Sequence, residues 1–236
     1  MKNKYYIATL SATVLTCAMA HAGDTLATAP TASSPTSGFS PYLGVSGVYN
    51  EFTLSALGED SVSDDATGFK LVGGFDLSHG FSVDGSFEKT YGSFGAGEAA
   101  ADLSFTDTRL IVNYTHELEQ GFSLVGGLGY GYLGSTVGGF TFSTEGLMAE
   151  VGIKYQSGQF FGGLQYNHLF AMHTSVPSFG GASPALPEED FGLIEAYVGY
   201  QINENVAATL SVETQVVGDS FIEKDLGIAL GLQYSF

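Results

Sequence analysis

The sequence contains no tryptophan, a single cysteine and few basic residues. Among its 236 residues, Lys and Arg account for seven and Asp and Glu for 25, which gives a formal net charge of −18. One cysteine excludes an intramolecular disulfide framework. The shortage of cations excludes nucleic acid as a partner, because binding it requires a basic surface that neutralises phosphate.

Long hydrophobic runs and helical periodicity are also missing. From Pro41 onward no stretch repeats its apolar residues with the period of a helix, and none approaches the ~20 apolar residues of a membrane-spanning helix. The chain has neither the spacing of a metal site nor a phosphate-binding glycine pattern followed by a helix. We therefore expect no metal and no cofactor.

Glycine and aromatic residues are abundant instead. The chain has 33 Gly, 13 Tyr and 18 Phe, whereas charged residues make up only 14%, against ~25% in ordinary soluble proteins. A disordered acidic chain would not contain so many aromatic residues. The composition therefore indicates a folded domain that is poor in charge.

The N-terminus has the pattern of a secretory signal peptide. Lys2 and Lys4 precede an apolar stretch at 5–19, and Ala20-His21-Ala22 provides a small-x-small cleavage signal. We expect residues 1–22 to be a signal peptide that directs export. An uncleaved anchor helix and a lipoprotein lipidated at Cys17 are weaker alternatives. Residues 23–39 are rich in Thr, Ser, Pro and Ala and predict a flexible leader.

Most of the remaining sequence alternates apolar residues with small or polar ones. In the last segment every second residue from Leu226 to Phe236 is apolar, and the residues between them are Gly, Ala, Gln and Ser. Alternation with a period of two indicates strands with one apolar face. Ten such segments can be distinguished: Ser40–Thr53, Ala66–Leu77, Phe81–Tyr91, Leu103–Thr115, Phe122–Leu133, Leu147–Gln156, Phe160–Ala171, Phe191–Gln201, Val206–Val216 and Leu226–Phe236.

The connections between these segments alternate between short and long. Short ones fall at 78–80, 116–121, 157–159 and 202–205, and long ones at 54–65, 92–102, 134–146, 172–190 and 217–225. Short turns at one end and long loops at the other are typical of outer-membrane barrels. We predict an all-β fold over residues 40–236, a closed antiparallel transmembrane β-barrel. Ten strands are favoured, and eight are the alternative, because closure requires an even number.

A soluble β-sandwich would show the same period, but other features favour the membrane. The segments are long, and tyrosines stand near the ends of the apolar faces, as an interfacial aromatic girdle requires. These tyrosines are Tyr49, Tyr91, Tyr114, Tyr155, Tyr200 and Tyr234. The opposite face is rich in Gly and Ser, which suit a crowded lumen.

The C-terminus adds a more specific motif. Leu230, Leu232, Tyr234 and the terminal Phe236 resemble the C-terminal assembly signal of Gram-negative outer-membrane proteins. Together, the barrel pattern and this C-terminal motif resemble those of the small OmpA-like or porin-like barrels. The resemblance implies residence in the outer membrane and contact with its lipid and lipopolysaccharide. It also implies recognition by the barrel-assembly machinery.

Ionisable residues are predicted to line the barrel interior, because a charge facing lipid at mid-depth costs ~2–4 kcal/mol. By the period of their segments, the inward set is Lys70, Asp76, Asp84, Glu88, Asp107, Arg109, Glu150, Lys154, Glu195 and Glu213. Excess carboxylate could line a narrow, cation-preferring pore. Alternatively, ion pairs could fill the lumen and close it. Lys89 falls on the apolar face near a loop, where it is expected to extend toward the interface.

The loops suggest two further functions. They carry acidic clusters at Glu59-Asp60, Asp64-Asp65, Glu188-Glu189-Asp190 and around Asp219, Glu223 and Asp225. Long acidic loops would suit a surface interaction protein with an external ligand that the sequence does not identify, or divalent bridging to lipopolysaccharide. As a remote alternative, His173-Thr174-Ser175 with Glu188 is similar to the His-x-Ser core of barrel lipid A deacylases. Val176 stands where that family has Asn, and we predict no enzymatic activity. His168 is expected to be an interfacial residue.

Overall fold

The computed structural model describes residues 40–54, 62–94, 100–175, 190–218 and 222–236. The expected signal peptide (1–22) and leader (23–39) lie outside the described residues. So do Glu59, Asp60, Glu188, Glu189 and Asp219 of the acidic loops.

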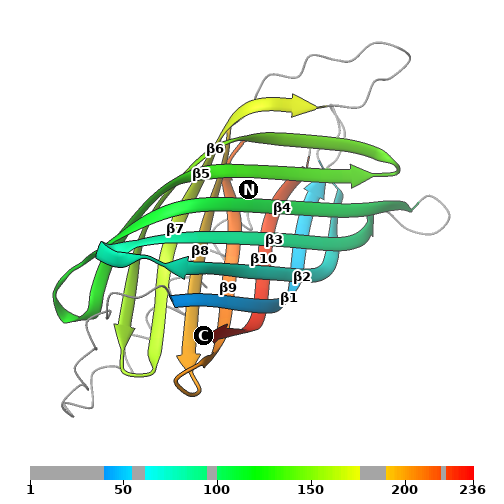
Figure 1. The fold of residues 1–236 in the computed structure, drawn as a ribbon. Helices are drawn as coiled ribbons and strands as arrows, with labels where there is room; N and C mark the ends of the chain where they lie inside the picture. Colours follow the sequence, from blue (N-terminus) through cyan, green and yellow to red (C-terminus); the bar gives the residue numbers. More distant parts are fainter. Residues whose placement is uncertain (1–39, 55–61, 95–99, 176–189, 219–221) are drawn as a thin grey trace.

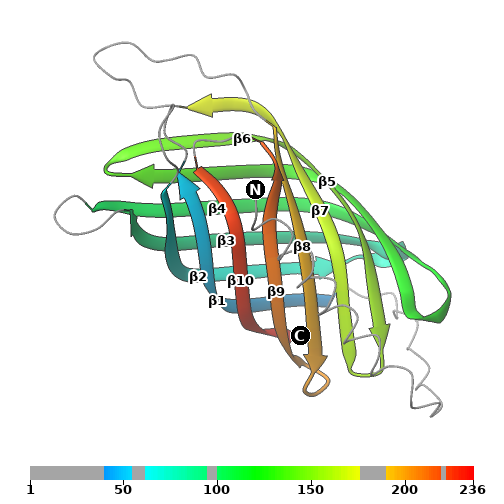
Figure 2. The ribbon, with the colours of Figure 1, turned by 180° about the vertical axis from the view of Figure 1, so that it is seen from behind.

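Ten antiparallel strands form a closed barrel (Figures 1 and 2). They are β1 (Ser40–Leu54), β2 (Val62–Asp76), β3 (Phe81–Phe94), β4 (Ala101–Glu117), β5 (Phe122–Val137), β6 (Phe140–Ser157), β7 (Phe160–Ser175), β8 (Phe191–Gln201), β9 (Val206–Val217) and β10 (Ile222–Ser235). Each strand pairs with its neighbour in sequence, and β1 pairs with β10 to close the ring. The prediction of ten strands is confirmed, and eight is excluded.

The short turns lie at one end of the barrel, and two of them share a local structure. Two of them contain a one-turn helix, η1 (Ser78–Gly80) and η3 (Glu119–Gly121). In the first, His79 and Gly80 have φ of 67° and 82°, and the Leu77 amide donates to the Phe81 carbonyl at 2.7 Å. A left-handed pair of this kind suits glycine at its second position, because glycine carries no Cβ. The chain therefore reverses within three residues at this end.

At the loop end the strands are longer than the sequence predicts. Residues 134–146 were expected to form a long loop, but β5 and β6 continue to Val137 and from Phe140, so only Gly138 and Gly139 connect them. This prediction is wrong because Phe140-Thr141-Phe142-Ser143 continues the alternation of β6, and the Ser and Thr residues there extend the two strands as a polar hairpin. Asp64 and Asp65 lie in β2, and Glu223 and Asp225 lie in β10, rather than in loops.

The outer face of the barrel is apolar. Alternate strand residues such as Leu128, Leu230 and Val151 expose 71%, 66% and 59% of their surface. At the turn end, cross-strand aromatic pairs follow the rim, with ring centroids 4.7–5.1 Å apart: Phe81 with Tyr114, Phe122 with Tyr155 and Phe160 with Tyr200. Such a ring of aromatics is typical of a membrane interface. No helix in the described part of the chain is long and apolar enough to span a membrane.

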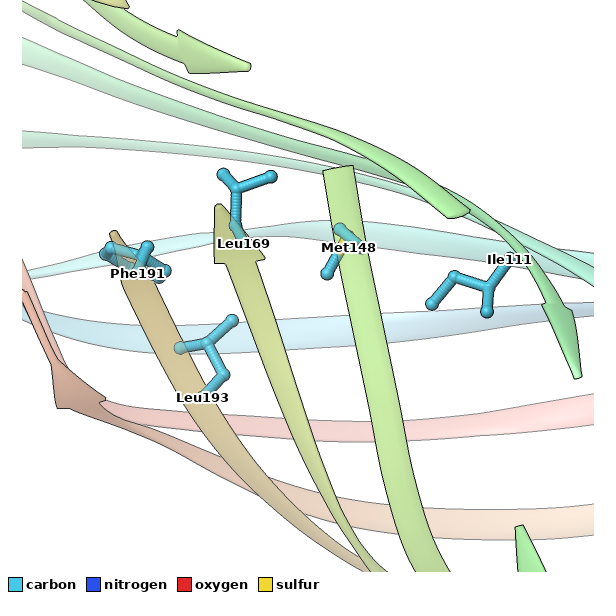
Figure 3. Packing of buried hydrophobic residues seen from close by; sticks show 5 residues of the cluster. All are labelled: Ile111, Met148, Leu169, Phe191 and Leu193. Atoms are coloured by element: carbon cyan, nitrogen blue, oxygen red, sulfur yellow. The ribbon is translucent and has the colours of Figure 1, made fainter. Parts of the chain in front are cut away.

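Apolar side chains also fill part of the interior. One cluster comprises Phe52, Ala66, Leu103 and Phe105, all at most 4% exposed. A second cluster comprises Ile111, Met148, Leu169, Phe191 and Leu193, which extend from β4, β6, β7 and β8 (Figure 3). The interior at the level of these clusters is therefore a packed core.

Glycines on the inner face make room for large neighbours. A Cβ at Gly199 would lie 2.1 Å from the Phe161 ring, and one at Gly163 would lie 2.8 Å from the Tyr197 ring. A ten-strand barrel has a narrow interior, so rings can be accommodated only where the facing residue lacks a side chain. This explains the abundance of glycine on the face opposite the apolar one.

Candidate functional site in the barrel lumen

A cluster of buried charges occupies the lumen. It consists of Glu88, Asp107, Arg109, Glu213 and Lys224, each 2–7% exposed, and is called here the lumen network. Arg109 Nη2 lies 2.9 Å from Glu213 Oε2, and Arg109 Nε donates to both oxygens of Asp107 at 3.0 Å. Buried charges are tolerated only when they are paired and hydrogen-bonded. Here each cation has two carboxylate partners.

Lys224 is the second cation of the lumen network. Its Nζ lies 2.8 Å from Glu213 Oε1 and 3.0 Å from Glu88 Oε1. Asn50 Nδ2 donates to the same Glu88 oxygen at 2.7 Å. Glu213 thus accepts from Arg109 with one oxygen and from Lys224 with the other, and this carboxylate connects the two cations.

Several ion pairs in the lumen connect strands that are three to five positions apart in the ring. Arg109 is on β4 and Glu213 on β9, which lie five positions apart in the ring of ten strands and therefore face each other. Lys224 of β10 reaches Glu88 of β3, and Lys70 of β2 lies 3.5 Å from Glu195 of β8. The Arg109–Glu213 ion pair therefore spans the lumen.

The turn-side half of the lumen holds a second group of charges, Asp76, Asp84, Glu150 and Lys154, called here the turn-side cluster. Asp84 accepts hydrogen bonds from Tyr42, from Ser82 at 2.7 Å and from Asn113 at 2.8 Å. Glu150 accepts from Gln165 Nε2 at 3.1 Å. Among the described residues Lys154 has no ion pair within 4.0 Å. This half of the lumen is therefore acidic, and its carboxylates Asp84 and Glu150 accept hydrogen bonds from neutral side chains.

The predicted inward residues are thus divided between two groups. Lys70, Glu88, Asp107, Arg109, Glu195 and Glu213 meet in or beside the lumen network, and Asp76, Asp84, Glu150 and Lys154 lie toward the turns. Two cavities of about 10 Å³ border the lumen network, each roughly the space of one water molecule.

The sequence analysis missed Lys224, which it assigned to a loop. In the structure a register shift pairs Leu226 with Glu51 but Lys224 with Phe52, so Asp225 is an extra residue on β10. A β-bulge of this kind reverses the alternation. Counting back from Leu226, Lys224 would face outward, but the bulge turns it into the lumen. The high cost of a lysine facing lipid was the one signal that could have revealed this.

The residues of the remote hydrolase hypothesis are not assembled into a catalytic site. His173 and Ser175 lie at the exposed end of β7, and no hydrogen bond connects them in the described structure. Glu188 lies outside the described residues. His168 faces outward, where its Nδ1 lies 2.7 Å from the Tyr166 hydroxyl and its Nε2 lies 3.3 Å from Asp190 Oδ2. Within the described ranges no cluster of three metal-ligating side chains occurs.

Comparison with known proteins identifies the fold. No family model and no curated protein matches the sequence. An outer-membrane channel from Pseudomonas putida F1 matches with a TM-score of 0.51 and 8% identity, over 84% of this chain and 96% of that chain. The attachment invasion locus protein Ail of Yersinia pestis, in complex with a heparin analogue, matches with a TM-score of 0.42 and 14% identity, over 84% and 99%.

The outer-membrane protease OmpT of Escherichia coli matches with a TM-score of 0.48 and 13% identity, over 84% of this chain and 96% of that chain. Together with the closed ten-strand ring, the match to the channel shows that the chain has the fold of bacterial outer-membrane β-barrel proteins. At this level of identity the similarity defines the architecture alone.

Proposed function

We propose that the protein is an integral outer-membrane β-barrel with a closed lumen and a structural role. The apolar outer face and the aromatic pairs at the turn end support the membrane location. The contact between Arg109 and Glu213 across the barrel supports a closed lumen. A barrel of this size is filled by its own side chains unless they are small, and here charged and apolar side chains fill it.

Conductance in a planar bilayer tests the closed lumen. The refolded protein is expected to insert without steady channel openings, because the ion pairs across the lumen and the apolar clusters leave no water-filled path. Heat-modifiable migration on gels serves as the control for folding. A stable, cation-selective current from folded protein would refute the closed lumen and favour the narrow pore instead. The acidic turn-side cluster would then provide its selectivity.

One observation favours surface interaction as a second function. β5 and β6 have 16 and 18 residues, whereas ~9–11 suffice to cross a membrane. We therefore infer that their common hairpin, drawn as long green ribbons in Figure 1, extends beyond the membrane. Thr136 and Thr141 hydrogen-bond across it at 3.0 Å. We expect a variant shortened between residues 134 and 145 to fold normally. Cells that express this variant should no longer adhere to a surface to which cells with the wild-type protein adhere. Unchanged adhesion would exclude this hairpin as the binding element.

A further inference from the structure

Among the residues that the structure describes, Lys89 is the single lysine or arginine on the outer wall of the barrel. The chain has seven Lys and Arg residues, of which Lys2 and Lys4 precede the barrel. Lys70, Arg109, Lys154 and Lys224 face the lumen. Lys89 lies on the same face of β3 as the exposed Phe87 and Tyr91. Its side chain therefore faces outward from the barrel.

The Lys89 ammonium has hydroxyl neighbours but no carboxylate. Its Nζ donates to Thr106 Oγ1 at 2.7 Å and to Ser104 Oγ at 3.3 Å, and lies 5.5 Å from the centre of the Tyr91 ring. Among the described residues no Asp or Glu forms an ion pair with it. An ammonium has three donors, so one donor remains for an anion from outside the protein.

The position of Lys89 along the barrel axis indicates that an anion bound to it would lie at the loop-side membrane interface. Lys89 follows Phe81 of the turn-side aromatic rim by eight residues along β3. On a strand that rises ~3.3 Å per residue and is tilted by ~40°, this corresponds to roughly 20 Å. The apolar band of such barrels is ~25 Å tall. The ammonium therefore lies just inside the loop-side boundary, and it extends toward Ser104 and the aqueous phase.

We propose that Lys89, with Ser104 and Thr106, forms a binding site for a phosphate group of lipid A in the loop-side leaflet. This inference rests on the proposed membrane location. The charges are complementary, because a phosphate provides the anion that the ammonium lacks, and the two hydroxyls can donate to further phosphate oxygens. Phe69 pairs with Lys89 across β2 and β3, and Phe87 precedes Lys89 by two residues on the same face of β3. Their rings are 6.0 Å apart and would contact the acyl chains.

Lipid retention by purified, refolded protein tests this site. The protein in detergent is incubated with bis-phosphorylated lipid A, with lipid A whose phosphates have been removed, or with phosphatidylglycerol, and the bound lipid is quantified by native mass spectrometry. Wild type is compared with Lys89→Met and Lys89→Arg. Lys154→Met is the matched control, because it removes a lumen cation. Lys89→Gln is the second variant if Lys89→Met does not fold, as judged by heat-modifiable migration.

We expect Lys89→Met to retain about ten-fold less bis-phosphorylated lipid A, the effect of losing one charge-assisted contact. Lys89→Arg and Lys154→Met should bind as wild type does, and the dephosphorylated lipid should not distinguish the variants. Equal retention by Lys89→Met and wild type would overturn the site. If Lys89→Met reduced the retention of phosphatidylglycerol as much as that of lipid A, the assignment to lipid A would be overturned. Failure of the wild type to float with lipid vesicles would instead refute the membrane location itself.

Discussion

Arg109 on β4 and Glu213 on β9 form an ion pair of 2.9 Å between strands that face each other across the barrel. Each of them has a further partner, since Arg109 also binds Asp107 and Glu213 also binds Lys224. A pair at this position ties the two halves of the wall together. The proposed closure of the lumen rests on this pair.

Removing Arg109 is expected to destabilise the barrel strongly. Arg109→Met leaves Asp107 and Glu213 buried with too little positive charge, and breaking a buried ion pair in this way costs about 3–5 kcal/mol. Urea unfolding in detergent micelles measures the loss of stability. It is followed by circular dichroism, because the chain has no tryptophan for fluorescence. Lys154→Met is the control, because Lys154 is partly exposed and has no ion pair within 4.0 Å among the described residues. Equal losses in both variants would contradict a special role for Arg109.

Lys224 and Glu88 are expected to be energetically coupled. Their charged atoms lie 3.0 Å apart, and both side chains are buried. In a double-mutant cycle with Lys224→Met and Glu88→Gln, the double variant should be more stable than the sum of the single losses predicts, with a coupling of about 1–3 kcal/mol. The free energy of unfolding of the four proteins provides the result. Strict additivity would show that the 3.0 Å contact contributes nothing.

The inner glycines are expected to be sensitive to substitution where a ring faces them. Gly199→Ala places a Cβ 2.1 Å from the Phe161 ring, and the resulting overpacking should cost about 1–3 kcal/mol. Gly47→Ala is the matched control, because a Cβ at this outward position has no neighbour within 4 Å. The two variants can be compared by the temperature at which heat-modifiable migration is lost. A lower temperature for Gly47→Ala would contradict the packing argument.

The sequence was sufficient to predict the barrel because alternation and turn spacing are local properties. The apolar face from Leu226 to Phe236 and the short turn at 78–80 could be identified without knowledge of any contact. The inward placement of Arg109 followed from the cost of a charge in lipid.

The partners within the lumen could not be predicted in the same way. Arg109 and Glu213 meet because the tilt of the strands brings β4 and β9 to the same height, and this depends on the register of every strand between them. Lys224 faces inward because of a bulge at Asp225, which the alternation does not indicate and only the cost of a lysine facing lipid could have revealed. Alternation therefore assigned the faces of most strands, but the three-dimensional register decides which charges pair.

Deleting Phe236 is expected to impair assembly more than the stability of barrels already folded. Phe236 is 71% exposed, and its ring centroid lies 5.0 Å from that of Tyr234. Its amide donates to the Pro41 carbonyl at 3.0 Å. Loss of such a ring removes at most ~1.5–3 kcal/mol of burial. The terminal strand must also pair with β1, because an open edge cannot remain in hydrocarbon. If the assembly machinery recognises this aromatic residue, its loss acts mainly on delivery to the membrane.

Two measurements separate these effects. The amount of heat-modifiable protein in isolated outer membranes reports assembly, and the melting temperature of the purified, folded fraction reports stability. We expect the first to fall several-fold and the second by at most ~3–12 °C, because a loss of 1 kcal/mol shifts the midpoint of a domain of this size by about 2–4 °C. Phe236→Tyr keeps an aromatic terminus and is expected to assemble normally. Normal membrane levels of the truncated protein with a much lower melting temperature would show that Phe236 acts on stability instead.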